Sequence, residues 1–413
     1  MKVLHTADWH LGQRFCQEER TEEHHHFLFG QLLPLIQAEQ VEVLVVAGDV
    51  FDTGSPSNAA LDLYYSFLAK LRDTPCRHVV VVGGNHDSPA TLLAPQQALR
   101  HLGVTVVADV PDDAAEQLII LTDAAGQPAL MVVAVPYLRE RHLGLNTAGK
   151  TLDDIAAQIR HGIARHYSEL APRAAPHRAA GLPVLATGHL FAAGLARTEG
   201  MRDVQVGNLG MIGADCFPET FDYVALGHIH KPQVVGGQAH IRYSGSPIPL
   251  AFDEVDLPRR VLVLTFGETS GRPLIEEKLL TLKRRLLRFS GTPNQIADHI
   301  RAFAGAADEL PAWFGVDVTD WDGLTPLAGK ALIQEVELDR AADLRVLRIG
   351  QPATARAATL AGAAAQGRHL RELTETEVFE ELLKQKKLAP EPADALRQTF
   401  RELLTWHHER ASA

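Results

Sequence analysis

The sequence predicts an α/β protein that carries a small α+β domain and a helical C-terminal region. Between residues 1 and 275, short β-like apolar runs alternate with helix-like segments, which is the pattern of an α/β fold. From about residue 276 the pattern changes, because the strands no longer end in side chains that could bind a ligand. Residues 350–413 have the periodicity of amphipathic helices. We therefore expect three regions, at 1–275, 276–349 and 350–413.

The first region contains the strands and helices on which a site would be built. Short apolar runs that end in Gly or Pro indicate strands, and longer amphipathic segments indicate helices. The expected strands are residues 2–6, 43–47, 79–82, 130–135, 184–186, 223–226 and 261–266. The expected helices are residues 18–37, 58–71 and 152–169, the last followed by an Ala- and Pro-rich loop over 171–183.

The second and third regions contain no strand that ends in candidate ligands. Residues 276–349 predict strands at 285–289, 313–318 and 344–349 and helices at 295–303 and 327–336, a domain for recognition and not for chemistry. In the third region, Thr374 and Glu377 form a capping box ahead of an apolar face, and a second apolar stripe follows Pro392. Two interpretations of these stripes stay open: docking on a partner protein, or packing against the rest of this chain.

Composition limits the classes of protein to which this chain can belong. Its 413 residues suit two or three domains, and no run approaches the roughly 20 apolar residues that span a bilayer. Three widely spaced cysteines and the lack of a signal-peptide pattern favour the cytosol. The net charge of −11 is unusual for a protein that lives on DNA phosphates. Contact with nucleic acid would therefore need a local positive surface or a basic partner.

Five of the expected strands are followed at once by side chains of the kinds that bind metal ions. Because the carboxyl ends of such strands meet at one edge of a sheet, these side chains should converge. They combine carboxylate, imidazole and amide groups, which is the composition of a two-metal phosphoesterase site. The candidate ligands, in chain order, are Asp8, His10, Asp49, Asn85, His189, His228 and His230.

The chemistry of these ligands supports a pair of divalent cations. Asp8 and His10 lie two positions apart, so strand alternation would place both on the same side. Asp49 offers two oxygens and could bridge two ions. Asn85 adds a neutral oxygen, which limits the negative charge of the site. Hard oxygens with imidazole nitrogens suit Mn²⁺, Mg²⁺, Fe²⁺ or Zn²⁺ and do not select among them.

Three further residues lie beside the candidate ligands. His86 follows Asn85 on a turn, and it is our candidate for a catalytic residue that contacts the substrate phosphate and not the metal. Asp52 and Asp87 could each orient a ligand by a hydrogen bond from behind, or could instead cap a turn. Both interpretations stay open for these two carboxylates.

Other segments look functional but have simpler explanations. Residues 144–151 match the letters of a P-loop, but no strand leads directly into them. We interpret Thr151 as the N-cap of the following helix, with Asp153 and Asp154 in its first turn, and expect no nucleotide site. The tract from His24 to His26 lies inside an expected helix, where a solvated or interface surface is the simpler interpretation. His5 is expected in the core.

The ordered motifs resemble those of the calcineurin-like metallophosphoesterase superfamily and, within it, those of the SbcD family of bacterial nuclease subunits. The similarity is dense over residues 1 to about 255. It rests on the segments HTADWHLGQ (5–13), VVAGDVFDTGSP (45–56), GNHD (84–87), ATGH (186–189), ALGHIH (225–230) and RYSGSPIP (242–249). The resemblance implies a two-sheet sandwich flanked by helices, a small α+β cap domain and C-terminal helices.

The resemblance also implies a site and an activity. One metal ion would be bound by Asp8, His10, Asp49 and His230, and a second by Asp49, Asn85, His189 and His228, with His86 as the catalytic histidine. The implied activity is Mn²⁺-dependent cleavage of DNA, as a 3′–5′ double-strand exonuclease and a single-strand or hairpin endonuclease, with Mg²⁺ as an alternative metal. The implied partner is an SbcC-like coiled-coil ATPase, bound to a homodimer of this chain in a heterotetramer. Such a complex would serve DNA recombination, repair and replication at the cytoplasmic nucleoid.

Two other functions fit parts of the sequence. A calcineurin-like phosphatase or small phosphodiester hydrolase would share the fold, but residues 48–54 lack the Arg that protein phosphatases carry after the second carboxylate. A non-catalytic scaffold for the ATPase would explain the C-terminal stripes. The complete ligand set argues against a scaffold as the sole role.

Overall fold

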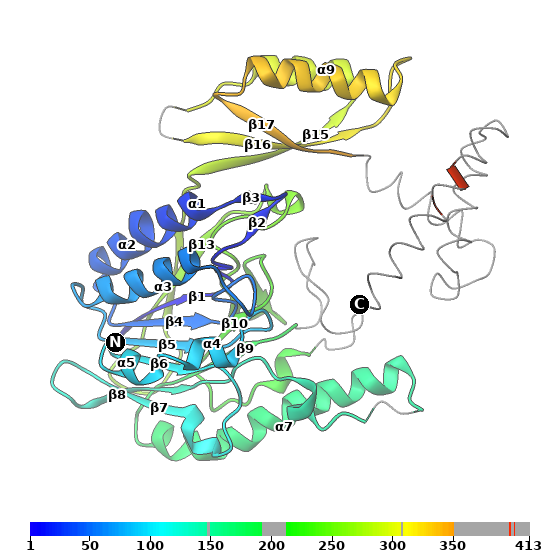
Figure 1. Cartoon of the computed structure of the whole chain (residues 1–413). Coiled ribbons are helices and arrows are strands. Elements are labelled where there is room, and N and C mark those ends of the chain that lie inside the picture. The colour runs from blue at the N-terminus through cyan, green and yellow to red at the C-terminus, as the bar shows by residue number, and fades with distance from the viewer. Residues whose placement is uncertain (147–148, 192–211, 307–308, 351–395, 398–399, 401–413) are drawn as a thin grey trace.

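The computed structural model describes residues 1–146, 149–191, 212–306, 309–350, 396–397 and 400. Within them, two six-stranded sheets pack face to face, and a separate three-stranded sheet lies at one end of the molecule (Figure 1). This arrangement confirms the α/β sandwich with an additional small α+β unit.

The first sheet has the strand order β14-β13-β1-β4-β5-β6. Strands β1, β4, β5 and β6 run parallel, and β13 and β14 complete the sheet in antiparallel pairings. Their bounds are β1 Lys2–Thr6, β4 Val43–Ala47, β5 His78–Val82, β6 Val104–Val107, β13 Arg260–Thr265 and β14 Leu274–Leu279. The sheet thus continues past residue 275, the expected end of the first region.

The second sheet has the strand order β11-β12-β10-β9-β8-β7. Its four central strands are parallel, while the edge strands β7 and β11 are antiparallel to their neighbours. The bounds are β7 Leu118–Thr122, β8 Pro128–Val133, β9 Val184–His189, β10 Tyr223–Gly227, β11 Gln233–Val235 and β12 Gln238–Tyr243.

Successive apolar side chains of a buried strand point to opposite faces of the sheet. One face therefore packs against the other sheet, and the opposite face packs against helices. In β4, Val43 and Val45 pack between the two sheets with Leu185, while Leu44 and Val46 face the helices. Strands buried on both faces are typical of parallel sheets covered by helices. The helices over the first sheet are α1 Thr21–His25, the π-helix η1 His26–Leu32, α2 Leu33–Ala38, α3 Asn58–Leu71, α4 Pro89–Leu93 and α5 Gln96–Arg100.

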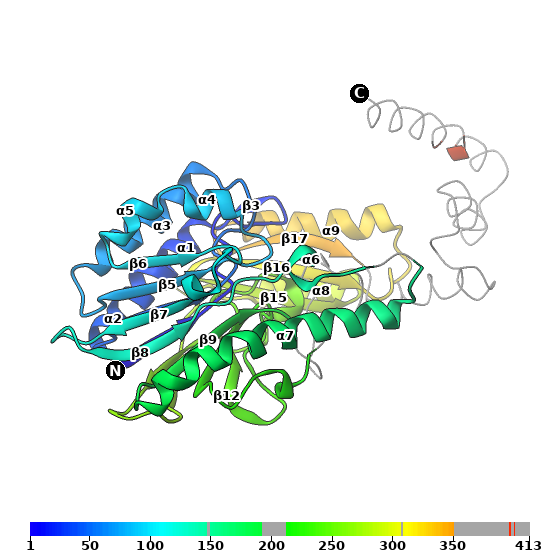
Figure 2. The same cartoon turned by 90° about the horizontal axis from the view of Figure 1, so that it is seen from below.

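A single long helix covers the second sheet. Helix α7, Leu152–Ala179, runs along β8 and β9 (Figure 2), and its buried residues pack on that sheet. The remaining short elements of the sandwich are α6 Glu140–Leu143, the 3₁₀ turns η2 Ala114–Gln117, η4 Ala214–Cys216 and η5 Phe252–Glu254, and the ribbon β2 Arg14–Phe15 with β3 Glu18–Glu19.

The small unit beyond β14 has its own core. Its three parallel strands lie in the order β15-β16-β17, and two helices cover one face around Phe314 and Ile333. The bounds are β15 Arg284–Gly291, α8 Pro293–Ala302, β16 Leu310–Val318, α9 Pro326–Asp339 and β17 Leu344–Gly350. A hydrophobic cluster with side chains from both parts joins this unit to the sandwich. It includes Phe15 and Phe252 of the sandwich and Trp313 of the small unit. We call this unit the cap.

Three expectations about helices need correction. The helix that begins at Leu152 does not end at 169 but continues to Ala179 through Pro172 and Pro176, so the loop expected over 171–183 is wrong. Both prolines are exposed, and the buried Ala171 and Ala174 pack on the sheet, so packing outweighs the lost hydrogen bonds. The helix expected over 18–37 begins only at Thr21, because Glu18 and Glu19 pair with β2.

The histidine tract from His24 to His26 was expected to lie on a solvated or interface surface. This expectation is wrong for one of the three histidines. His24 is fully buried, whereas His25 is exposed. Burial lowers the pKa of His24 to about 3, so the ring is neutral. His5 is buried as expected, with Nδ1 3.0 Å from the hydroxyl oxygen of Tyr223.

The C-terminal stripes lie almost wholly outside the described residues, so the helices expected there stay a prediction, as does the three-region division. Among the described residues, no helix combines the length and apolar character that crossing a membrane requires.

Candidate metal centre

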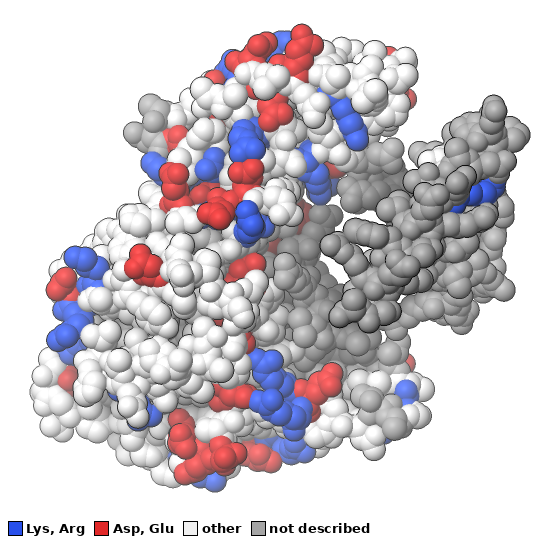
Figure 3. Space-filling model, viewed as in Figure 1, with Lys and Arg blue, Asp and Glu red and all other residues white. Residues whose placement is uncertain are grey.

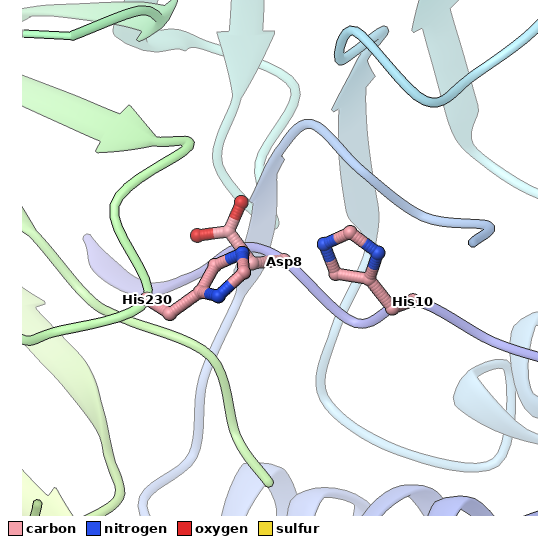
Figure 4. A group of neighbouring side chains, drawn as sticks. All are labelled: Asp8, His10 and His230. Carbon is pink, nitrogen blue, oxygen red and sulfur yellow. The ribbon is translucent and has the colours of Figure 1, made fainter. Parts of the chain in front are cut away.

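The structure brings all seven candidate ligands to one edge of the sandwich. They follow β1, β4 and β5 of the first sheet and end or follow β9 and β10 of the second. Figure 4 shows Asp8 and His10 on the segment after β1 and His230 opposite them on the loop after β10. The cluster therefore joins both sheets, and most of its side chains are buried.

Tight backbone turns, not strand alternation, aim several of these side chains. Asp8, His10, Asp49 and His228 have φ values of 55°, 47°, 50° and 94°, in or near the left-handed region that non-glycine residues rarely adopt. The alternation argument for Asp8 and His10 is therefore wrong, because β1 ends at Thr6. Strain of this kind persists where the surrounding structure fixes it, and it gathers at functional sites.

Glycines allow the loops after β4 and β5 to pack closely. Gly48 has a φ of +89°, and a Cβ there would lie 2.2 Å from Nδ1 of His189. A Cβ on Gly84 would lie 2.1 Å from Oδ1 of Asp49. The Gly-Asp and Gly-Asn pairs of the sequence therefore have a steric cause.

Asp49 lies at the centre of the cluster. Its Oδ2 is 3.2 Å from Nε2 of His189 and 3.5 Å from Nε2 of His10, and its Oδ1 accepts a hydrogen bond from the backbone N–H of His86. On the far side, Asn85 Oδ1 is 2.9 Å from Nε2 of His189 and 3.0 Å from Nδ1 of His228. Asp49 thus contacts both halves of the site.

Most of the imidazoles are oriented through the same nitrogen. Nδ1 lies 3.1 Å from Asp52 Oδ1 in His10, 2.9 Å from the carbonyl of Ala47 in His189 and 2.9 Å from Glu254 Oε1 in His230. An oxygen acceptor at Nδ1 leaves Nε2 as the nitrogen for a metal ion, and such partners are typical of metal-binding histidines. His228 differs, because its Nδ1 faces Asn85.

Within the cluster, Asp49 and His189 stabilise each other's charged forms, whereas burial disfavours the charged forms of Asp8 and His228. Burial raises the pKa of Asp8. Burial acts in the same direction on Asp49, but the charge and hydrogen bond of His189 outweigh it and hold the pKa of Asp49 below its usual range. Burial also opposes a charged His189, yet Asp49 raises the pKa of that ring to about 9. His228 has a pKa lowered to about 3 by burial and then by the charge of His189.

The donor set fits divalent cations on geometric grounds. Three groups bring potential ligand atoms within 4.8 Å of one another: Asp8 with His10 and His230, Asp49 with His189 and His228, and His10 with Asp49 and His86. Two buried atoms of the cluster, Asp8 Oδ2 and His10 Nε2, have no hydrogen-bond partner in the described part of the chain. A cation would satisfy both.

The three neighbouring residues also lie at the site. Asp52 contacts His10 from behind, and its backbone carbonyl accepts a hydrogen bond from Nδ1 of His86 at 2.7 Å. Burial lowers the pKa of His86. The carboxylate of Asp87 accepts hydrogen bonds from the backbone N–H groups of Val50, Phe51 and Gly84, and so holds together the loops after β4 and β5.

Sequence reasoning missed two residues behind His230. Glu254, which is fully buried, contacts Nδ1 of His230 and accepts a hydrogen bond from the backbone N–H of Leu250 at 3.0 Å. Arg259, also buried, forms a salt bridge with Glu254 at 3.3 Å. The charge of His230, with Arg259, overcomes burial and lowers the pKa of Glu254 to about 2. No spacing pattern in the sequence links these residues to His230.

The segment with P-loop letters leads into the start of helix α7. Thr151 caps helix α7, with its hydroxyl accepting a hydrogen bond from the N–H of Asp154. The side chain of Asp154 in turn accepts from the N–H of Thr151 at 3.1 Å. This confirms the capping interpretation of Thr151.

The two-sheet fold and its histidine–carboxylate cluster define a metallophosphoesterase. The family model for calcineurin-like phosphoesterases matches residues 1–232, and the model for the type 5 capsule protein repressor C-terminal domain matches residues 282–387. The alignment with a dimetal phosphatase of known structure from Danio rerio covers 68% of this chain and 98% of the phosphatase chain, at 15% identity and a TM-score of 0.39.

Similar proteins indicate the group of metallophosphoesterases to which the chain belongs. The D subunit of nuclease SbcCD from Escherichia coli (strain K12) is 35% identical over 404 residues, which are 97% of each chain. Its counterpart in Rhodobacter capsulatus is 39% identical over 64% of this chain and 66% of its own, and that in Bacillus subtilis is 31% identical over 67% and 72%. The chain therefore belongs to the calcineurin-like phosphoesterase family, in the group formed by the SbcD subunits of nuclease SbcCD.

Proposed function

We propose that this chain is the metal-dependent nuclease component of an SbcCD-type complex and hydrolyses phosphodiester bonds in DNA. The observation that carries the proposal is the convergence of all seven candidate ligands on one buried cluster. The relatives named as nuclease subunits, one of which aligns over 97% of the chain, support the substrate class. The activities inferred for this chain are 3′–5′ double-strand exonuclease and single-strand or hairpin endonuclease.

The proposed ligand assignment follows the geometry around Asp49. Asp8, His10, Asp49 and His230 bind one ion, and Asp49, Asn85, His189 and His228 bind the second. We assign Mn²⁺ to both positions, with Mg²⁺ as the alternative. Two such ions stabilise charge on the phosphate and lower the pKa of a bound water. Asp52 and Glu254 orient His10 and His230, while Asp87 fixes the loops that carry Asp49 and Asn85.

His86 is proposed as the catalytic residue that acts on the substrate. The hydrogen bond from Nδ1 to the carbonyl of Asp52 fixes the ring, and the ring lines a cavity together with His10. From this position it can stabilise charge on the phosphate or donate a proton to the departing sugar oxygen. A positioned acid of this kind contributes about 10²–10⁴ in rate.

The rest of the proposal concerns assembly. The relatives' name makes them one subunit of a complex, which supports an SbcC-like ATPase as the partner. We assign residues 350–413 to docking on that ATPase and residues 276–349 to capping the nuclease domain. The working unit is a homodimer of this chain within a heterotetramer, acting on nucleoid DNA in recombination, repair and replication.

Cleavage of a labelled DNA hairpin and a blunt duplex tests the proposal. We expect the purified chain with Mn²⁺ to cleave both, EDTA to abolish cleavage, and His86→Ala to lose about 10²–10⁴ in rate while still binding metal. His101→Ala, which changes an exposed histidine away from the site, is the matched control and should cleave normally.

The other outcomes separate the alternatives. Cleavage only after the ATPase partner and ATP are added would place substrate delivery outside this chain. Hydrolysis of p-nitrophenyl phosphate without cleavage of DNA under either condition would favour a phosphatase. Tight binding of the ATPase without any metal-dependent hydrolysis would leave the scaffold function.

A further inference from the structure

A cavity of about 330 Å³ extends from the metal centre to the cap. Its lining includes His10, Asp52 and His86 of the candidate metal centre. The lining also includes Arg14 of β2 and Arg348 of β17, one arginine from the sandwich and one from the cap. Its volume falls within the range of about 300–1,000 Å³ of small-ligand sites.

The two arginines are prepared for binding in different ways. Arg14 is exposed, and its guanidinium has no hydrogen bond or salt bridge in the described part of the chain. Arg348 is held in place, since its guanidinium lies 3.5 Å from the buried carboxylate of Asp317 and 5.4 Å from the ring of Phe252.

Other residues attach the cap to the nuclease domain. Arg345 forms a salt bridge with Glu18 at 2.9 Å, and Arg284 forms one with Glu23 at 2.8 Å. The ring of Trp313 stacks on that of Phe15. Arg14 forms none of these three contacts.

The two arginines make the cavity suitable for an anion, although the chain as a whole is acidic. The chain carries a net charge of −11, and Figure 3 shows Lys and Arg mixed with Asp and Glu over one face without a broad basic patch. A guanidinium binds phosphate oxygens in a bidentate manner. The cavity is also lined by the carboxylate of Asp52, and Arg348 pairs with Asp317, so Arg14 is the guanidinium that stays available where the phosphodiester chain of a substrate would run.

We propose that Arg14 and Arg348 bind a backbone phosphate next to the one that is cleaved, so that the cavity between β2 and β17 selects polynucleotides over single phosphodiesters. This inference rests on the proposed nuclease function and adds a specificity site to it. It also explains how an acidic chain contacts DNA without a broad basic patch.

Two substrates that differ in their number of phosphates test this assignment. Bis(p-nitrophenyl) phosphate has only the scissile phosphate, whereas a short single-stranded oligodeoxynucleotide has neighbouring ones. With Mn²⁺ and the full chain, we expect Arg14→Gln to lower the ratio of kcat/KM for the oligonucleotide to that for the small diester by about tenfold. Arg14→Lys should restore much of the ratio, because it keeps the charge. Arg348→Gln should act in the same direction.

Binding supplies a second readout that a structural role would not change. For the labelled oligonucleotide, the slope of log Kd against log salt should fall by about 0.7 in Arg14→Gln, as expected for one lost phosphate contact on a single strand. Arg345→Gln is the matched control, since it removes a cap arginine that pairs with Glu18 and does not line the cavity. We expect it to keep the substrate ratio of the unmodified chain.

The contrary outcomes show whether the phosphate contact alone, or the nuclease function with it, is wrong. An equal loss on both substrates, or the same loss in Arg345→Gln, would overturn the phosphate contact and leave the nuclease function standing. An unchanged ratio and salt slope in Arg14→Gln would do the same. An unmodified chain that hydrolyses the small diester but neither binds nor cleaves the oligonucleotide would overturn the nuclease function and this inference together.

Discussion

At the scale of single residues, hydrogen bonds behind the ligands organise the site. His10, His189 and His230 each present Nδ1 to an oxygen that belongs to Asp52, Ala47 or Glu254, which fixes the direction of the other nitrogen. Of the two carboxylate partners, Glu254 is the more deeply buried, and Arg259 holds that carboxylate from the far side. Glu254 is therefore a positioning residue for the proposed metal ligand His230.

We expect Glu254→Gln to weaken binding of Mn²⁺ by about 10–100-fold, the usual cost of losing such a partner. The substitution keeps the size of the side chain but removes its charge, so His230 becomes a poorer and less well oriented ligand. Calorimetric titration of the metal-free chain with Mn²⁺ measures the effect. Glu277→Gln, which changes a more accessible carboxylate paired with Arg242, is the control. Equal affinities in all three proteins would contradict the role of Glu254.

At the scale of elements, strand ends were predictable and the turns beyond them were not. The runs of β1 and β4 are visible as apolar segments, so their ends could be expected to bring the ligands to one edge of a sheet. The left-handed backbone of Asp8 and His10 is imposed by contacts between loops, such as the bond from the Asp8 N–H to the carbonyl of Gly48. The role of Glu254 could not be predicted either, because only the folded chain brings this residue next to His230.

The turn after β5 allows a direct test of this packing. A methyl group at Gly84 would overlap Asp49, so Gly84→Ala should displace that carboxylate and destabilise the chain by about 1–3 kcal/mol. It should also weaken metal binding, because Asp49 contacts both halves of the site. Thermal unfolding with and without Mn²⁺ measures both effects.

Gly267→Ala is the matched control, because a Cβ there would meet no atom within 4 Å and its φ is not positive. We expect it to leave the melting temperature and the Mn²⁺-induced stabilisation nearly unchanged. If Gly84→Ala behaved like this control, the close approach of the two loops would not be needed to form the site.

At the scale of the whole molecule, two sheets must hold together for the ligands to meet. His5 of β1 and Tyr223 of β10 form a hydrogen bond across the buried interface between the sheets. Burial lowers the pKa of His5 from 6.5 to about 3, so the folded protein keeps this ring neutral. The unfolded chain binds a proton there at higher pH than the folded chain does.

This difference gives the stability of the sandwich a defined dependence on pH. Between pH 6.5 and about 3 the unfolded state binds more protons, so the free energy of unfolding should fall as pH falls, by at most about 1.4 kcal/mol per pH unit for one histidine. His5→Gln keeps a partner for Tyr223 but cannot titrate, so its melting temperature should fall less steeply with acid. Parallel profiles for the metal-free proteins would show that His5 does not titrate in this way.

We propose that one buried cluster, with Asp49 shared, holds two metal ions. Anomalous X-ray diffraction at the manganese edge, from crystals grown with Mn²⁺, tests it most directly. We expect two peaks on either side of Asp49, one beside Asp8, His10 and His230 and the other beside Asn85, His189 and His228, and neither in Asp49→Ala. A single peak, or peaks away from these side chains, would contradict a two-ion site that shares Asp49.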